Sequence, residues 1–545
     1  MQHEQNNYFS TIQAIEKLFI SKKFNNALTK ANKLLKSYPK SEELLNFKSI
    51  ILLELNRYSE CILTLESALK INDRNPFFYL NMANVYQKQG HYSLAINFYN
   101  KSLNLEENPN TYINLATTLY KFSRFQESKE VLNKVFSMAP HNEVAHQLFA
   151  SNCREMHDFE NHKKHLEIAI NLNPSNYENY FHLGFYYQSL GDFNNALEYY
   201  SKSIQLNNLH GEAIYNLHKL NNFSLFNDTF NPKKILNHFE HADIESKSYI
   251  YLLISMYHRR KKEYEHFYKY LNLANKLKSN LYPFNMQDEI NHFDKVKKIF
   301  SKLDQLNTND INSVDYKFTP IFIMGMPRSG SSVAEQMISN DSNVYGGGEI
   351  AVLYSQINYA IENHVNFDDL LSSLVDIKKN YIVHINQMTK HAVFTDKLPL
   401  NFKYLGFIKL LFPNSKFILT TRNKSNNFFS IYTNFFSGFS LNFGNNRKDI
   451  LNFYEIYLKY LSFWEDNNIK FHTHNYDDFM KNKKVILKSL FGNIGLDYKD
   501  SYLELKENRR PVLTASNTQI RGEIKNDRPS DEIEILTKLY PEFFT

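Results

Sequence analysis

The residues between Pro320 and Val333 form a pattern suited to binding an anion. An apolar run is followed by a loop of small residues and then by the pattern of a helix. Gly325 and Gly330 have the spacing of the glycines in a P-loop, where backbone N–H groups surround a phosphate at the start of a helix. The sequence therefore predicts an oxyanion site at this strand-to-helix turn.

This loop departs from that of a nucleotide triphosphatase at one position. Ser331 stands where those proteins carry the lysine that reaches the β- and γ-phosphates. The cation of the loop is instead Arg328, whose planar group of N–H donors matches an oxyanion. We therefore expect a ligand whose phosphate carries a group other than a γ-phosphoryl.

Short apolar runs alternate with helical patterns around and after this loop. The predicted strands are Pro320–Met324, Ala392–Thr395 and Lys416–Thr421, and the predicted helices are Ser332–Ser339 and Tyr404–Phe412. Such alternation is typical of a parallel sheet covered by helices on both faces. Ligands of these sheets bind at the carboxyl ends of the strands, so the residues that follow the predicted strands are expected to share one site.

A repeat accounts for the first part of the chain. Its marker positions recur every 33 or 34 residues, the period of tetratricopeptide repeats, at Ala27, Cys61, Ala95, Ser128, His162 and Ala196. The period predicts about six helix pairs within residues 1–208, stacked as a solenoid. Residues 209–306 keep a helical pattern without the period and are expected to cap the array. The polar stretch Asp304–Lys317 is the expected boundary before a second domain, residues 318–545.

Composition and charge argue against several classes of protein. The 545 residues carry a formal net charge of +6, and the lysines are spread along the chain, so no nucleic-acid partner is expected. Cys61 and Cys153 are too few for a disulfide framework. The polar N-terminus and the lack of a long apolar run predict a cytoplasmic protein without a membrane span. The oligomeric state is left open.

Two pairs of histidines share a face of a predicted element. His162 and His165 lie on one helix of the repeats, and His472 and His474 lie on one strand. Neither pair has a carboxylate or thiol at the spacing of a metal ligand set. No metal site is therefore expected.

Five short motifs occur in a fixed order in the second domain. They are Met326–Ser332, Gly346–Glu349, Asp396–Asn401, Phe412–Asn414, and Arg422 followed by Ser430. Together they resemble the sulfotransferase family, in particular the bacterial type in which tetratricopeptide repeats precede a domain similar to tyrosylprotein sulfotransferases. The resemblance covers residues 318–521 and extends weakly over the repeats as far as Asn275–Lys278. It implies a multidomain chain, an all-α repeat solenoid followed by an α/β, P-loop-like domain with a parallel sheet.

The resemblance also implies an activity and a donor. The activity is transfer of a sulfonate from 3′-phosphoadenosine 5′-phosphosulfate to an acceptor hydroxyl, without a metal. The loop that holds the 5′-phosphosulfate matches Arg328, Ser329, Gly330, Ser331 and Ser332. Arg328 is also expected to act in catalysis, beside Glu349 as general base and Lys397 as the cation that stabilises the bridging oxygen.

Further donor contacts are implied at four positions. Arg422 and Ser430 match the pair that grips the 3′-phosphate, Tyr476 matches a tyrosine that contacts the nucleotide, and Ser516 lies in the segment that closes over the donor. The chain departs from the family after Arg422, where Asn423 and Lys424 replace Asp-Pro, and after Arg521, where a basic, Trp-containing stretch is missing. The donor contacts beyond Ser516 are therefore left open.

Two other functions and the identity of the acceptor stay open at this point. The second domain could be a degenerate P-loop phosphotransferase, or an inactive nucleotide-binding domain attached to a repeat-based scaffold. Because concave repeat surfaces commonly bind peptides, a protein tyrosine is the favoured acceptor. A carbohydrate or lipid hydroxyl is the alternative.

Overall fold

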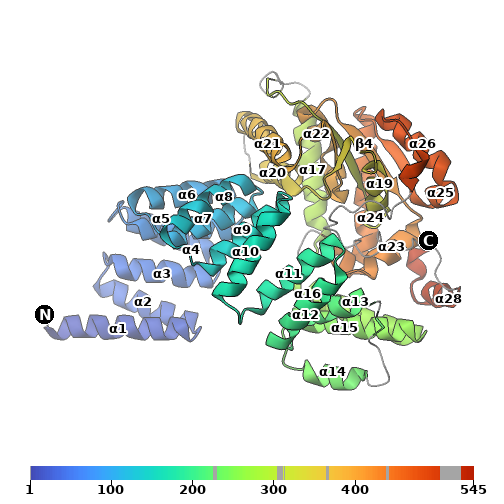
Figure 1. Cartoon of the computed structure of the whole chain (residues 1–545). Coiled ribbons are helices and arrows are strands. Elements are labelled where there is room, and N and C mark those ends of the chain that lie inside the picture. The colour runs from blue at the N-terminus through green and yellow to red at the C-terminus, as the bar shows by residue number, and fades with distance from the viewer. Residues whose placement is uncertain are drawn as a thin grey trace. The chain divides into compact units, whose positions relative to one another are not determined.

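The computed structural model describes residues 2–221, 223–224, 230–303, 311, 313–363, 367–436, 441–503 and 530–544. The chain divides into two compact units, residues 1–172 and 173–545 (Figure 1). The first unit is helical, and the second contains further helices and then an α/β fold.

Ten helices make up the first unit: α1 Gln2–Ile20, α2 Phe24–Ser37, α3 Glu42–Glu54, α4 Tyr58–Leu69, α5 Pro76–Lys88, α6 Tyr92–Leu105, α7 Pro109–Lys121, α8 Phe125–Met138, α9 Glu143–Glu155 and α10 Phe159–Leu172. Successive helices pack as pairs, and each pair also contacts the next one. The second unit begins with one more such pair, α11 Tyr177–Leu190 and α12 Phe193–Leu206. The predicted repeat array is confirmed.

The marker positions of the repeat show why the period is kept. Each lies in the first turn of the second helix of a pair, and none exposes more than 4% of its surface. The three that are not alanine, Cys61, Ser128 and His162, each bond a backbone carbonyl twelve residues earlier, on the partner helix. A larger or unbonded polar group there would separate the paired helices or leave a buried donor unsatisfied.

Five helices follow the repeats in the second unit: α13 Gly211–Leu220, α14 Pro232–His238, α15 Ile244–Arg260, α16 Tyr264–Leu281 and α17 Met286–Leu303. Of these, α15 and α16 pack closely as an antiparallel hairpin. Within the described part of the chain, no helix combines the length and the apolar character needed to cross a membrane.

The second unit contains a five-stranded parallel sheet. Its strands are β1 Thr319–Gly325, β2 Val344–Gly346, β3 Val393–Asp396, β4 Lys416–Thr421 and β5 His472–Asn475, in the order β2-β3-β1-β4-β5. The three strands predicted from residues 320, 392 and 416 are confirmed to within one residue at each end. The short strand β2 was not predicted. The helix expected at Tyr404–Phe412 is confirmed to within one residue at each end as α22 Leu405–Leu411, and a 3-10 turn, η1 Pro399–Tyr404, precedes it.

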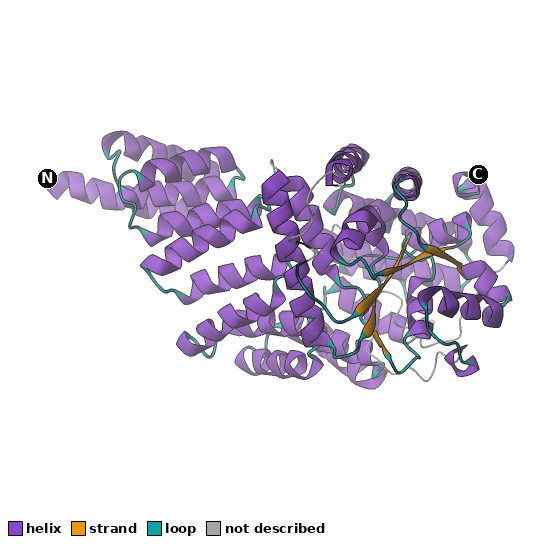
Figure 2. Cartoon of the chain, turned by 90° about the horizontal axis from the view of Figure 1, so that it is seen from above, coloured by secondary structure: helices purple, strands orange, loops and turns teal. Residues whose placement is uncertain are grey.

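Helices cover both faces of the sheet (Figures 1 and 2). Ile321, Ile323 and Ile418 face α19 Ser331–Ile338, α25 Tyr476–Lys481 and α26 Lys483–Ile494. Phe322 and Phe417 alternate with them and face the other side, where Tyr381 of α21 Phe367–Met388 lies 6.5 Å from Phe322 between ring centroids. Burial on both faces accounts for the continuous apolar runs by which the strands were predicted.

The helices before the sheet are bonded directly to the α/β fold. Lys403 of η1 forms an ion pair of 2.6 Å with Glu289 of α17, and Tyr404 lies 2.9 Å from a ring nitrogen of His292. Residues 304–310 and 312 of the expected boundary lie outside the described residues. The predicted domain limits at 208, 306 and 318 stay predictions, and α13–α17 belong to the same compact unit as the sheet.

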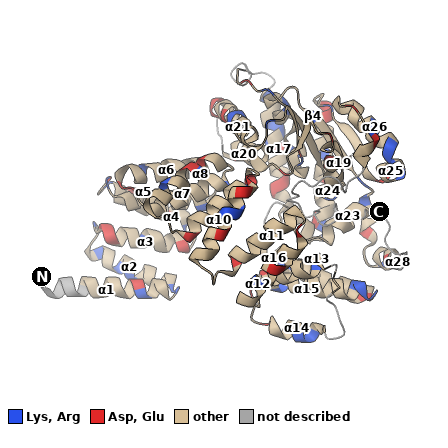
Figure 3. Cartoon of the chain, in the orientation of Figure 1, with Lys and Arg blue, Asp and Glu red and all other residues tan. Residues whose placement is uncertain are grey.

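Charged residues of both signs are distributed over the helices of both units (Figure 3). This distribution matches the spread of lysines along the sequence. Among the described residues, no single face of either unit is set apart by its charge in this view. The charged residues considered for a functional site form a local group at the carboxyl ends of the strands.

Candidate functional site

The direction in which the chain crosses the sheet changes between β1 and β4. From β1 the chain crosses towards β2 and β3, and from β4 it crosses the other way to β5. Because the two connections leave in opposite directions, the loops after β1 and β4 diverge, and ligands of such sheets bind there. The two predicted arginines, Arg328 and Arg422, follow these two strands.

Two glycines allow the loop after β1 to adopt its path. Gly325 has φ +143, and a Cβ there would lie 2.3 Å from the backbone oxygen of Thr420 on β4. Gly330 has φ +98, and a Cβ there would lie 2.5 Å from the ring of Tyr476. Gly330 also precedes α19, whose first turn has no capping side chain. The loop thus lies tight against β4 and presents the start of a helix, as an anion site requires.

Arg328 is held in place by the segment after β4. Its Nε donates to Ser430 Oγ at 3.1 Å, and Ser430 lies on α23 Lys424–Tyr432. Asn427 of the same helix donates to the carbonyl of Pro327 at 2.8 Å. Burial, aided by the nearby charge of Arg422, lowers the pKa of Arg328 to about 10. The structure therefore brings Arg328, Arg422 and Ser430 together.

Arg422 has an unsatisfied buried donor. Its guanidinium carbon lies 4.9 Å from the centroid of the Tyr476 ring, and one terminal nitrogen is 3.5 Å from the carbonyl of Arg328. Its Nε is buried without a hydrogen-bond partner, and Arg422 forms no ion pair with any residue that the structure describes. Buried charged donors are normally satisfied, so this arrangement indicates a site for an anionic ligand.

The serines of the loop have different surroundings. Ser329 is fully buried, and its hydroxyl lies 2.7 Å from that of Thr420, which donates to the carbonyl of Met324. The Ser329 side chain thus fastens the loop to β4. Ser331 and Ser332 are the first two residues of α19. Ser516 lies outside the described residues.

A second pair of predicted residues lies on the other side of β1. Lys397, directly after β3, has its Nζ 2.5 Å from Glu349 Oε1. The lysine side chain is 1% exposed and that of Glu349 is 42% exposed. The buried amine therefore pairs with a carboxylate that solvent can reach, rather than with its sequence neighbour Asp396.

The glycine run before Glu349 is fixed by hydrogen bonds to β3 and α19. Gly347 N donates to the carbonyl of Thr395 at 3.0 Å, and Lys397 N donates to the carbonyl of Gly348 at 2.7 Å. Gly348 N donates to Glu335 Oε1 at 2.7 Å, and the Thr395 hydroxyl donates to the same oxygen at 2.8 Å. Sequence reasoning missed Glu335, a buried carboxylate in an ordinary helical pattern, because only the fold shows which N–H groups it meets.

Asp396 supports the turn that carries Lys397. Its carboxyl is fully buried and accepts from the hydroxyl of Tyr381 at 2.8 Å and from the amide of Asn401 at 3.3 Å. Burial raises the pKa of Asp396 to about 8, and the charge of Glu335 acts in the same direction. The sequence signal that could have indicated this supporting role is a carboxyl, that of Asp396, at the end of an apolar strand.

Of the four histidines of the sequence analysis, the two on the repeat helix have hydrogen-bond partners within the repeats. His162 bonds the carbonyl of Ala150, and burial lowers its pKa to about 4. His165 lies 2.9 Å from a ring nitrogen of His146. His474 is buried in β5, and its pKa is lowered to about 4 by burial.

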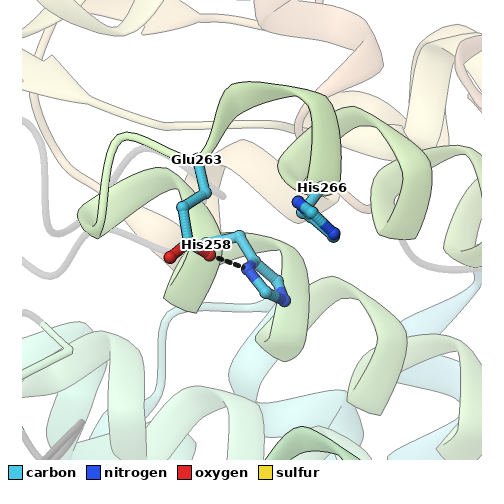
Figure 4. A group of neighbouring side chains, drawn as sticks. All are labelled: His258, Glu263 and His266. Atoms are coloured by element: carbon cyan, nitrogen blue, oxygen red, sulfur yellow. Dashed lines mark hydrogen bonds and ion pairs between the residues drawn. The ribbon is translucent and has the colours of Figure 1, made fainter.

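One other group has the composition of a metal ligand set, at the corner between α15 and α16 (Figure 4). His258, Glu263 and His266 bring one possible ligand atom each within 4.8 Å of one another. Figure 4 shows the bond of 2.6 Å between His258 Nδ1 and Glu263, which lowers the pKa of that carboxyl. Four consecutive basic residues, 259–262, form the corner and disfavour a bound cation. The hydrogen bond accounts for the geometry, and we assign no metal to it.

Comparison with known families gives two matches along the chain. Residues 320–500 match the model described as sulfotransferase family. Residues 78–109, 109–142 and 177–208 match the model described as tetratricopeptide repeat.

Among curated proteins, an "Uncharacterized protein" of Aquifex aeolicus (strain VF5) is 28% identical over 220 residues, which cover 37% of this chain and 29% of that protein. This chain therefore spans less than a third of that relative.

Solved structures similar to part of the chain include two helical repeat proteins. MamA 41-end from Desulfovibrio magneticus RS-1 is 22% identical, with a TM-score of 0.29, and the match covers 30% of this chain and 94% of that one. TTC0263, a thermophilic TPR protein in Thermus thermophilus, is 12% identical, with a TM-score of 0.29, and the match covers 32% of this chain and 94% of that one.

Proposed function

Because this chain is a tetratricopeptide-repeat member of the sulfotransferase family, with its sulfotransferase domain at residues 320–500, we propose that it moves a sulfonate group from 3′-phosphoadenosine 5′-phosphosulfate to an acceptor hydroxyl. The observation that carries the proposal is the unsatisfied Nε of Arg422 beside Arg328, at the switch point of the sheet. Two guanidinium groups there suit a ligand with more than one anionic group.

The residues present fit the two anionic ends of this donor. The loop Arg328–Ser332 and the start of α19 would hold the 5′-phosphosulfate, with Ser329 fixing the loop to β4. Arg422 and Ser430 would hold the 3′-phosphate, and Tyr476, against which Arg422 lies, would contact the nucleotide. For Ser516 the proposed donor contact rests on the resemblance alone, since this residue lies outside the described part of the chain. The serine at the P-loop lysine position argues against a nucleoside triphosphate as the ligand.

The donor supplies an activated sulfonate. A bond forms between the acceptor oxygen and sulfur, the bond between sulfur and the bridging phosphate oxygen breaks, and adenosine 3′,5′-bisphosphate leaves. In the protein, Glu349 takes the proton of the acceptor hydroxyl, since its carboxylate is the partly exposed member of the ion pair. Arg328 and Lys397 stabilise the negative charge on the leaving oxygen.

The ion pair couples these two roles. While Glu349 is ionised, it holds the buried ammonium of Lys397 at 2.5 Å. When Glu349 takes up the proton, its charge is lost and the attraction to Lys397 falls. The ammonium then turns its charge towards the leaving oxygen, so that the two groups act in succession.

The proposed acceptor is a hydroxyl on a peptide or protein, with a tyrosine as the favoured group. The supporting feature is the stack of helix pairs from α1 to α10, with the further pair α11 and α12 at the start of the second unit, because repeats of this kind bind peptides along a concave side.

The experiment that tests the function is a transfer assay. The purified chain is incubated with donor labelled in the sulfonate and with a cell extract, and the products are identified by mass spectrometry. We expect label on a protein tyrosine. Label on a sugar or lipid would keep the activity and change the acceptor, whereas phosphate transfer from ATP in place of sulfonate transfer would overturn the proposal.

A further inference from the structure

Two helical elements begin directly after the proposed catalytic pair. The helix α20 Ala351–Asn363 starts two residues after Glu349, and the 3-10 turn η1 starts two residues after Lys397. The two elements pack against each other, and the rings of Tyr354 on α20 and Tyr404 on η1 lie 5.3 Å apart between centroids. The distance between the carboxylate and the ammonium therefore depends on how α20 and η1 are held together.

The helix α17, which precedes the sheet, contacts both elements through one row of polar side chains. Glu289, His292 and Lys295 follow one another at a spacing of three residues and so lie on one face of the helix. Glu289 pairs at 2.6 Å with Lys403 of η1, which is buried. His292 Nδ1 lies 2.6 Å from Glu362 Oε1 of α20, and Lys295 pairs with the same carboxylate. One face of α17 thus holds η1 and α20 at the same time.

The hydroxyl of Tyr404 joins all three elements. It is buried, donates to Asn358 Oδ1 of α20 at 2.7 Å, and lies 2.9 Å from His292 Nε2 of α17. Because the hydroxyl proton goes to Asn358, the second contact is a bond that Tyr404 accepts from His292. The other ring nitrogen of His292 bonds Glu362, and this bond lowers the pKa of that carboxyl to about 2. Removing the hydroxyl would therefore break the connection between η1 and both of its neighbours at one point.

We propose that Tyr404 is a positioning residue for the transfer reaction. Its hydroxyl fixes η1 against α20 and so sets the distance between Glu349 and Lys397. This inference rests on the proposed function, in which the ammonium first holds the carboxylate and then turns to the leaving oxygen, so a small change in their separation alters turnover. Arg328 of the donor site is held by α23 instead, and donor binding should therefore not depend on Tyr404.

Removal of a single hydroxyl group tests the proposal on the whole chain. Tyr404→Phe keeps the buried ring, and turnover in a labelled-sulfate assay should fall by about tenfold. The affinity for adenosine 3′,5′-bisphosphate, measured by calorimetry, should change by less than about twofold. Tyr460→Phe is the matched control, because that hydroxyl is buried without a hydrogen-bond partner among the described residues, and its ring lies against Phe293 of α17 and Phe402 of η1. The control should leave both turnover and affinity unchanged.

A double-mutant cycle gives a readout that separates positioning from a purely structural role. If Tyr404 acts through the catalytic pair, its hydroxyl matters only while that pair works. In a chain that already carries Glu349→Gln, Tyr404→Phe should therefore lower the remaining turnover by less than about threefold. A structural defect would lower turnover by the same factor with and without Glu349→Gln, and that result would overturn the proposal.

The outcomes separate this inference from the function on which it rests. If the wild-type chain transfers no sulfonate, the proposed function fails and the inference fails with it. If the wild type is active and Tyr404→Phe has the turnover of Tyr460→Phe, or loses donor affinity in place of turnover, Tyr404 is not a positioning residue and the function stands. Should Tyr404→Phe not fold, Asn358→Ala decides, because it removes the acceptor of the same bond at a partly exposed position. It should lower turnover and keep donor affinity, and wild-type turnover would overturn the proposal.

Discussion

Two groups of residues lie at the carboxyl ends of the strands: those after β1 and β4 (the β1–β4 half) and those after β2 and β3 (the β2–β3 half). The two halves satisfy their charges in opposite ways. At β1 and β4, two guanidinium groups lie together, and one buried N–H group of Arg422 has no partner. At β2 and β3, the charges of Glu349 and Lys397 are paired at 2.5 Å, and the glycine run before Glu349 is hydrogen-bonded to Thr395, Lys397 and Glu335. Under the proposed function, a ligand would complete the first half, whereas the second half is already paired and would change only when its ion pair opens.

This difference predicts that the two halves can be separated by mutation. Changes at the β1–β4 half should alter the affinity for the donor, because its cations are placed to meet an anion. Changes at the β2–β3 half should alter turnover, because its groups are paired before the donor arrives.

The largest effect is expected at Glu349. Glu349→Gln keeps the shape of the side chain and removes the base, so turnover should fall by roughly two to four orders of magnitude. The affinity for adenosine 3′,5′-bisphosphate should stay nearly unchanged. A labelled-sulfate assay with calorimetry measures both, and Glu455→Gln, an exposed change on α24 Arg447–Asp466, is the control. Full activity of Glu349→Gln would place the base elsewhere.

The next effect is expected at Arg422. Arg422→Ala removes the cation proposed for the 3′-phosphate, and binding should weaken by about 1.5–3 kcal/mol, the range for a hydrogen bond to a charged group. The rate at saturating donor should be kept. Lys416→Ala, an exposed change at the other end of β4, should leave binding unchanged. If Arg422→Ala lowered only turnover and left the affinity for the donor unchanged, the assignment of donor binding to the β1–β4 half would be wrong.

Gly330→Ala tests the shape of the β1–β4 half. An alanine at φ +98 is strained, and its Cβ would push on the ring of Tyr476 that supports Arg422. We expect a loss of about 1–2 kcal/mol in the free energy of unfolding, together with weaker donor binding. Gly492→Ala, which lies in α26 and meets no atom within 4 Å, should be neutral or slightly stabilising. Equal denaturation midpoints for the two variants would contradict the role given to Gly330.

The smallest effect is a pH dependence at the β2–β3 half. The pKa of Asp396 in the folded protein is about 8, above its ordinary 3.8, so between these values the native state holds a proton that the unfolded state releases. Stability from this group therefore falls as pH rises through that window, by roughly 1 kcal/mol per pH unit. Asp396→Asn has no titratable carboxyl at this position, so its stability lacks this dependence on pH. Denaturation at pH 5.5 and 6.5 should show that the free energy of unfolding declines less with pH in the variant than in the wild type. An equal decline in both would refute the assignment.

Features that depend on short stretches of chain could be predicted from the sequence. The repeat array follows from its period, because each repeat packs mainly against its neighbours. The loop after β1 follows from two glycines and an arginine. The strand β2 could not be predicted, since it has three residues, the last of them the first glycine of the glycine run, and so carries no pattern of its own.

Features that depend on which elements meet could not be predicted. Glu335 accepts hydrogen bonds from Gly348 and Thr395, which lie 13 and 60 residues from it in the sequence. The pairing of Lys397 with Glu349 rather than Asp396 also depends on the fold. Burial raises the pKa of Asp396, and the carboxyl oxygens of Asp396 accept hydrogen bonds from Tyr381 and Asn401.

The central claim is that the β1–β4 half is a site for a nucleotide with a 3′-phosphate, and thermal denaturation with two ligands tests it most directly. At a concentration of about 100 times its dissociation constant, adenosine 3′,5′-bisphosphate should stabilise the chain by about 2.7 kcal/mol and raise the melting temperature. ATP with magnesium, at the same concentration, should raise it much less, because the loop lacks the P-loop lysine. Equal or greater stabilisation by ATP would contradict the account.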